Sequence, residues 1–220
     1  MVWTLPNILT VARIALTPVI ALLPFIRGWI PKLIAFVVFL VAAISDIYDG
    51  RLARERDEIT DLGKILDPLA DKLLLFATLV PIYWITRYPM HEYEIPWWGN
   101  LPLWVAVLLV AREVVMTVFR HLAQQRGVVI AAGRAGKLKT IIQDIFIGAT
   151  IAWFAWKDMA ASFGWRRGWL GALWEQFHGT VVAVTLAIAV LITVYSLGVY
   201  FYRYRRLLTG APPPGTPDGS

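Results

Sequence analysis

Long runs of apolar residues, separated by short polar segments, dominate this chain from its start to about residue 202. A helix needs about 20 predominantly apolar residues to cross the hydrocarbon core of a bilayer. Few charges interrupt the runs, and Trp and Tyr gather at their edges, as amphipathic rings do at the depth of lipid headgroups. The pattern predicts six transmembrane helices, over residues 8–25, 33–47, 66–85, 101–122, 141–156 and 181–202.

Composition agrees with this interpretation, because 58% of the 220 residues are hydrophobic and 16% are charged. Soluble domains average about 45–50% apolar and about 25% charged residues. The fold class is therefore all-α, an integral membrane bundle. We expect residues 1–209 to form one domain and the Pro- and Gly-rich residues 210–220 to be disordered. The absence of Cys excludes disulfide frameworks, thiolate catalysis and Cys-based metal sites.

Basic residues predict the orientation of the bundle. The segments after the second and fourth apolar runs, and the residues after the sixth, hold more Lys and Arg than the segments on the opposite side. Cytoplasmic loops of membrane proteins carry such an excess. We therefore expect a multi-pass protein of the inner (cytoplasmic) membrane with both termini in the cytoplasm.

Four aspartates recur at short intervals around the end of the second apolar run and the start of the third. The chain reads Asp46-x2-Asp49-Gly50-x2-Ala53-Arg54, then eight residues, then Gly63-x3-Asp67-x3-Asp71. If the second helix continues past Asp49, Asp46 and Asp49 lie about 60° apart around its axis. Asp67 and Asp71 fall on one face of the third helix. A short reversal between the two helices then brings the four carboxylates together at the membrane surface.

Carboxylates beside apolar helices need a compensating charge. Because the motif contains no His or Cys, its oxygen donors suit a hard cation such as Mg²⁺, Mn²⁺ or Ca²⁺. Two ions bridged by shared carboxylates suit phosphoryl chemistry, so we expect two Mg²⁺ or Mn²⁺ ions. The alternative is that these aspartates are helix caps and interfacial charges. Asp67, which precedes Pro68, could be an N-cap, and this would weaken the argument from its spacing to Asp71.

This string of residues resembles the signature of the CDP-alcohol phosphatidyltransferases, D-x2-D-G-x2-A-R-x8-G-x3-D-x3-D, at every fixed position. The segment Pro6-Asn7-x2-Thr10-x2-Arg13 is also similar to the start of that family's first helix. The resemblance implies a six-helix membrane enzyme, usually a homodimer. Such enzymes transfer a phosphatidyl or similar group from a CDP-linked donor to an alcohol and release CMP.

The resemblance also implies a role for each matching residue. Asp46, Asp49 and Asp67 resemble the core metal ligands, and Asp71 resembles the catalytic base, with a possible second role as metal ligand. The residues expected to bind the CDP group are Asn7, Thr10, Asp49, Gly50, Ala53, Arg54 and Gly63. Arg13 either extends to the membrane interface or pairs with an aspartate of the motif, and the sequence leaves both alternatives open.

Cations near the cytoplasmic ends of the fourth and fifth runs predict a second, anion-binding pocket. The candidates for binding an acceptor phosphate are Arg112, Arg120, Lys137 and Lys139. Glu113 is expected to be a structural ion-pair partner, since an unpaired ion deep in an apolar run is costly. The pattern R-E-hydrophobic…R followed by G-K-x-K-T resembles the phosphatidylglycerophosphate synthase branch of the family.

That branch implies transfer of the phosphatidyl group of CDP-diacylglycerol to sn-glycerol 3-phosphate. Besides these substrates, the expected partners are the lipid bilayer and a second copy of the chain, without nucleic acid. The first alternative is the same chemistry with inositol phosphate, serine or phosphatidylglycerol as acceptor. A divalent-cation transporter and a non-catalytic membrane scaffold are alternatives from other classes, because aspartates within membranes also line ion paths.

Overall fold

The computed structural model describes residues 4–55, 60–87, 93–125, 134–165 and 168–208. Side chains are described for these residues except 47, 49–55, 61, 64, 134–137 and 203–208. All the regular elements of this part of the chain are helices: α1 (Leu5–Leu22), the short 3₁₀ helix η1 (Leu23–Phe25), α2 (Trp29–Glu55), α3 (Asp61–Arg87), α4 (Leu103–Gln125), α5 (Arg134–Phe163) and α6 (Trp169–Leu208). The prediction of an all-α protein with six long helices is confirmed. The tail 210–220 lies outside the described residues.

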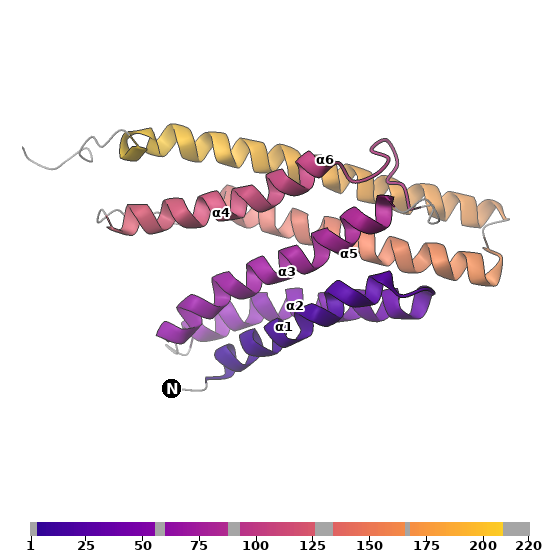
Figure 1. Cartoon of the computed structure of the whole chain (residues 1–220), viewed down its shortest axis with the longest axis horizontal. Coiled ribbons are helices and arrows are strands. Elements are labelled where there is room, and N and C mark those ends of the chain that lie inside the picture. The colour runs from indigo at the N-terminus through magenta and orange to yellow at the C-terminus, as the bar shows by residue number, and fades with distance from the viewer. Residues whose placement is uncertain (1–3, 56–59, 88–92, 126–133, 166–167, 209–220) are drawn as a thin grey trace, which may run out of the picture.

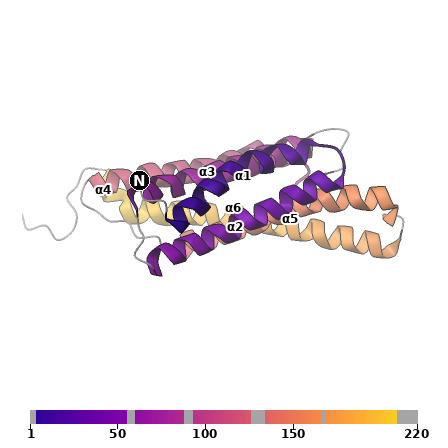
Figure 2. The ribbon, with the colours of Figure 1, turned by 90° about the horizontal axis from the view of Figure 1, so that it is seen from below.

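The helices form an elongated bundle along one long axis (Figures 1 and 2). α1 packs on α2 and α3, α2 packs on α5, and α6 packs on α5 and α4. α1 begins and α6 ends at the same end of the bundle, as an even number of crossings requires (Figure 1). This end also holds the end of α2 and the start of α3, where the predicted aspartates lie.

Four of the helices are long and apolar enough to cross a membrane, over Leu5–Phe25, Trp29–Asp46, Leu138–Phe163 and Trp169–Tyr202. α3 runs alongside them, and its 27 residues extend for about 40 Å at 1.5 Å per residue. Many large apolar side chains point outward, including Leu22, Trp104 and Leu191. A surface of this kind suits lipid contact, and the chain is a multi-pass membrane protein.

Small and bulky side chains alternate in the core between the helices. Ala35, Ala183 and Ala189 are fully buried and let neighbouring backbones approach closely. Phe146 and Phe154 of α5 fill the space that remains between the helices. The core therefore holds α5 at the centre of the bundle, in contact with α2, α3 and α6.

A buried polar network closes the end of the bundle opposite the aspartates. The Nζ atom of Lys32 donates hydrogen bonds to Asp158 Oδ2 (2.7 Å) and to the carbonyl oxygen of Ile26 (3.1 Å). The hydroxyl of Tyr93, in the connection between α3 and α4, donates to the other carboxylate oxygen of Asp158. Burial and this hydrogen bond raise the pKa of Tyr93 above its ordinary value, so the phenol stays protonated as a donor. The network joins α2, α5 and the α3–α4 connection.

Replacing Asp158 by alanine leaves the ammonium of Lys32 buried without its carboxylate. Breaking a buried ion pair costs about 3–5 kcal/mol, and the partial exposure of Asp158 reduces this cost. Because each kcal/mol shifts the unfolding midpoint of a chain this size by about 2–4 °C, we expect Asp158→Ala to lower it by at least about 5 °C in detergent. Glu94→Ala, at an exposed position of the same connection, is the control. Equal midpoints for the two variants would contradict a stabilising role for the network.

Candidate active site

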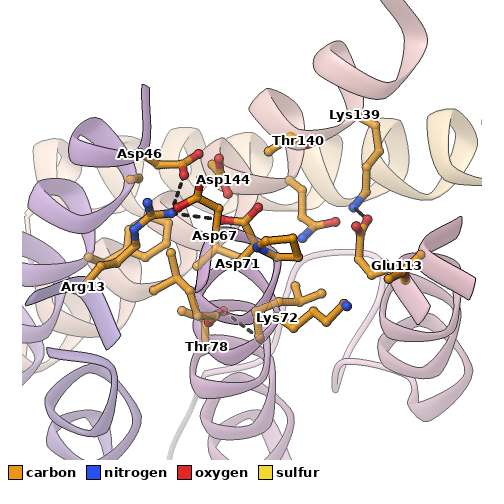
Figure 3. Close-up of a pocket in the computed structure, with 18 of the residues that line it drawn as sticks. Arg13, Asp46, Asp67, Asp71, Lys72, Thr78, Glu113, Lys139, Thr140 and Asp144 are labelled. Atoms are coloured by element: carbon orange, nitrogen blue, oxygen red, sulfur yellow. Dashed lines mark hydrogen bonds and ion pairs between the residues drawn. The ribbon is translucent and has the colours of Figure 1, made fainter. Parts of the chain in front are cut away.

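A cavity of about 210 Å³ lies between α1, α2, α3, α4 and α5, where charged residues from all five helices converge (Figure 3). Its charged lining residues are Arg13, Asp46, Asp67, Asp71, Lys72, Glu113, Arg120, Lys139 and Asp144. In Figure 3 the aspartates gather around Arg13, whereas Glu113 and Lys139 lie at the other side of the cavity. The cavity therefore has an acidic part and a part in which cations predominate.

The start of α3 places Asp67 and Asp71 on one continuous helix. α3 begins at Asp61 and runs through Pro68, so the interpretation of Asp67 as an N-cap is wrong. Thr60 caps the helix instead, because its Oγ1 accepts a hydrogen bond from the backbone N–H of Gly63 at 3.0 Å. Asp67 and Asp71 consequently lie one helical turn apart and line the same cavity.

Arg13 joins the two aspartate-bearing helices. Its guanidinium, on α1, is buried and donates hydrogen bonds from Nη1 to Asp46 of α2 and to Asp71 Oδ1 of α3, the latter at 3.0 Å. Of the two alternatives for Arg13, the structure shows the pairing with aspartates of the motif. The two carboxylates keep 39% and 59% of their side-chain surface exposed, so each can also reach a ligand in the cavity.

Asn7, Thr10 and Gly63 support the start of α3. Asn7 Nδ2 donates to Thr60 Oγ1 (2.9 Å), whose hydroxyl lies 3.1 Å from Asn7 Oδ1. Thr10 Oγ1 donates to Asp67 Oδ1 at 2.9 Å. A Cβ atom at Gly63 would lie 2.9 Å from Asn7 Oδ1, so a larger residue would have to displace the Asn7 side chain, which is hydrogen-bonded to Thr60. Asn7, Thr10 and Gly63 are not among the residues that line the described cavity, and their contact with CDP stays a prediction.

The other residues predicted to bind CDP lie on α2, which continues through them to Glu55. Asp49, Gly50, Ala53 and Arg54 thus share the helix of Asp46, as the motif predicts. Their side chains lie outside the described residues, so their roles in binding CDP, and that of Asp49 in binding metal, stay predictions.

Two of the four predicted acceptor-phosphate residues line the cavity. Arg120 and Lys139 line the cavity, whereas the side chain of Lys137 lies outside the described residues. Arg112 is buried and does not line the described cavity; it donates to Glu113 Oε1 (2.8 Å) and to Ser196 Oγ of α6 (3.1 Å). Glu113 also pairs with Lys139, which confirms its expected role as an ion-pair partner.

Two charged cavity residues were not identified as site residues from the sequence. Lys72 directly follows the last aspartate of the motif, and Asp144 lies on α5, about a turn after Thr140. Asp144 projects beside Asp46 and Asp67 in Figure 3. Lys72 extends away from them, towards the side of Glu113 and Lys139. The sequence could have indicated Lys72 as a site residue by its position next to the motif. It could have indicated Asp144 because that residue is a single acid within an apolar run.

Comparison with known proteins shows the family of the chain. A model of the CDP-alcohol phosphatidyltransferase family matches residues 3–195. The chain belongs to this family. Members of the CDP-alcohol phosphatidyltransferase family generally depend on divalent metal ions.

Three relatives of the chain carry names that describe enzymes of phospholipid synthesis. The chain is 37% identical to a probable phosphatidylglycerophosphate synthase of Mycobacterium tuberculosis H37Rv over 66% of its own length and 64% of the relative's length. It is 34% identical to the CDP-diacylglycerol–glycerol-3-phosphate 3-phosphatidyltransferase of Bacillus subtilis, over 68% and 77% of the two lengths. It is also 33% identical to a CMP-forming cardiolipin synthase of Streptomyces coelicolor, over 76% of each chain.

The hydroxyl of Thr60 is expected to stabilise the start of α3 and hence the position of Asp67. Thr60→Val keeps the shape but removes the bonds to Gly63 and Asn7, and loss of an N-cap costs about 1 kcal/mol or more. We therefore expect a lower free energy of unfolding in detergent for Thr60→Val, and a value close to that of the wild type for Thr60→Ser. If the two variants are equally stable, the hydroxyl does not hold this helix start.

Proposed function

We propose that the protein transfers the phosphatidyl group of CDP-diacylglycerol to sn-glycerol 3-phosphate, releasing CMP and phosphatidylglycerophosphate. The observation that carries this proposal is the single cavity in which aspartates of α2 and α3 meet cations of α3, α4 and α5. An acidic part suits metal ions and a pyrophosphate, and a cationic part suits an acceptor that itself carries a phosphate. The names of the mycobacterial and Bacillus relatives support the same substrates.

The donor set fits a pair of divalent ions. Asp46, Asp67 and Asp71 line the cavity with hard oxygen ligands, and the cation of Arg13 already lies between two of them. Within the described side chains, no three His, Cys, Asp or Glu residues stand ready as a metal cluster, and the side chain of Asp49 is outside that set. We propose that Asp46, Asp49, Asp67 and Asp71 hold two Mg²⁺ or Mn²⁺ ions. Such ions, when bound, neutralise the pyrophosphate and the charge of departing CMP.

Asp71 is the residue that we assign as the base. Its side chain is 59% exposed at the cavity wall, so an acceptor hydroxyl can reach it. Arg13 holds Oδ1 of this carboxylate, which directs the group, and Oδ2 is the oxygen that we assign to accept the proton of the hydroxyl. The acceptor oxygen then attacks the phosphatidyl phosphorus, and CMP leaves with the bonding electrons. Transfer of this proton as the new bond forms allows a carboxylate to act as the base.

The position of the cavity suits a lipid substrate. The surrounding helices carry apolar outer surfaces, so acyl chains can stay in the bilayer while the CDP group enters at the end of the bundle that holds the aspartates. The excess of Lys and Arg in the loops at this end supports a cytoplasmic orientation in the inner membrane. We propose in addition that two copies associate as a homodimer.

A second acceptor is favoured by one specific finding. The chain is similar to the CMP-forming cardiolipin synthase over 76% of its length, and this similarity keeps phosphatidylglycerol as an alternative acceptor in our proposal. Both reactions are proposed here with CDP-diacylglycerol as donor and CMP as product, so the acceptor distinguishes them.

An acceptor panel tests the proposal. Purified protein with CDP-diacylglycerol and Mg²⁺ is expected to release CMP with sn-glycerol 3-phosphate, and not with inositol phosphate, serine or phosphatidylglycerol. Asp71→Asn is expected to reduce kcat by about 10²–10⁴-fold, the typical contribution of a general base. Glu94→Gln, an exposed acid at the other end of the bundle, should retain wild-type activity. CMP release that depends on another acceptor would contradict the assignment, and ion flux into liposomes without CMP release would favour a transporter.

A further inference from the structure

Lys72 is a positively charged residue of the cavity, and the proposed reaction does not yet give it a role. It is half-buried on α3, one residue after Asp71, and it lines the same cavity. A helical residue that follows another is rotated by about 100° around the axis, so Lys72 diverges from Asp71. Figure 3 shows the result, since the Lys72 side chain extends away from Asp46 and Arg13 towards the side of Glu113 and Lys139.

The anionic groups described on that side of the cavity already have partners. Glu113 is shared by Lys139 and Arg112, with Arg112 Nη1 at 2.8 Å from Oε1. Within the part of the chain that the structure describes, Lys72 and Arg120 have no carboxylate partner. The Nε atom of Arg120 is moreover buried without a hydrogen-bond partner among the described residues. A cation held in a partly desolvated wall without an anion is costly, unless a ligand supplies the anion.

A phosphate dianion fits two such cations. Charge-assisted hydrogen bonds from Lys and Arg to phosphate are roughly twice as strong as neutral ones. Lys72 comes from the helix that carries Asp67 and Asp71, whereas Arg120 comes from α4. A phosphate held by both would therefore be fixed relative to the base, because Lys72 and Asp71 are neighbours on α3.

We propose that Lys72 binds the phosphate of the acceptor, together with Arg120, and thereby positions the reacting hydroxyl of the acceptor at Asp71. This assignment rests on the proposed function and deepens it. It makes α3 the helix that determines acceptor specificity, because the same turn carries the base and one phosphate ligand. The pyrophosphate of CDP-diacylglycerol is the other source of the same chemistry, and the test separates the two.

The test measures KM separately for the two substrates with Lys72→Ala, Lys72→Gln and Lys72→Arg. The expected result for the alanine and glutamine variants is a KM for sn-glycerol 3-phosphate at least about tenfold higher, with the KM for CDP-diacylglycerol within about twofold of the wild type. Lys72→Arg, which keeps the charge, is expected to recover most of the affinity. Lys157→Ala, which removes a lysine paired with Glu175 outside the cavity, is the matched control.

Each remaining outcome has one meaning. A KM change confined to CDP-diacylglycerol assigns Lys72 to the pyrophosphate and overturns the proposal, as does a KM for sn-glycerol 3-phosphate that is unchanged in both neutral variants. An equal loss of kcat in all three variants, with a lowered unfolding midpoint, indicates a structural role and also overturns it. A wild-type enzyme that releases no CMP with sn-glycerol 3-phosphate overturns the proposed function itself, and this assignment with it.

Discussion

Charge inside a membrane-spanning bundle must be balanced by charge, and Arg13 shows how this protein meets that constraint. The guanidinium is buried on α1 and binds carboxylates of both α2 and α3. A single buried cation in an apolar surrounding would be expensive, whereas one shared by two aspartates is balanced and geometrically fixed. The pairing draws three helices together at one point, and the cavity opens at that point.

The same rule organises the rest of the polar interior. At the opposite end, Lys32 pairs with Asp158, and Tyr93 satisfies the remaining carboxylate oxygen. Behind the cavity, Glu113 compensates both Arg112 and Lys139. Every cation of these networks contacts a carboxylate. Lys72 and Arg120 contact none among the described residues, and this difference is the basis on which we assign them to the acceptor phosphate.

The sequence predicted the six long helices well because each contains a long apolar run. Among the described residues, however, α3 and α4 are not among the four helices that length and hydropathy alone select as membrane spans. The sequence predicted the ends of the helices poorly, since those ends are polar. α3, for example, was expected from residue 66 but begins at Asp61, because Thr60 caps it and Pro68 is accommodated inside the helix. The motif also predicted that Asp46, Asp67 and Asp71 would share a site, because fixed helical spacing determines which residues share a face.

Spacing does not reveal which neighbouring helix a side chain will contact, and this explains what the sequence did not predict. Arg112, for example, donates a hydrogen bond to Ser196 of α6 and does not line the described cavity, so its role in binding an acceptor phosphate stays a prediction. Lys72 and Asp144 enter the cavity only because α3, α4 and α5 meet there. The roles proposed for Asp49, Arg54 and Lys137 depend on side chains outside the described part of the chain.

The central claim is that the aspartates of α2 and α3 together bind divalent ions, and direct titration of Mn²⁺ tests it without relying on activity. Electron paramagnetic resonance of free Mn²⁺, recorded as purified protein is added in detergent, gives the number of ions bound. The account predicts about two ions for the wild type and the loss of at least one in Asp67→Asn, with no loss in Glu94→Gln. Binding that is absent from the wild type, or unchanged in Asp67→Asn, would contradict it.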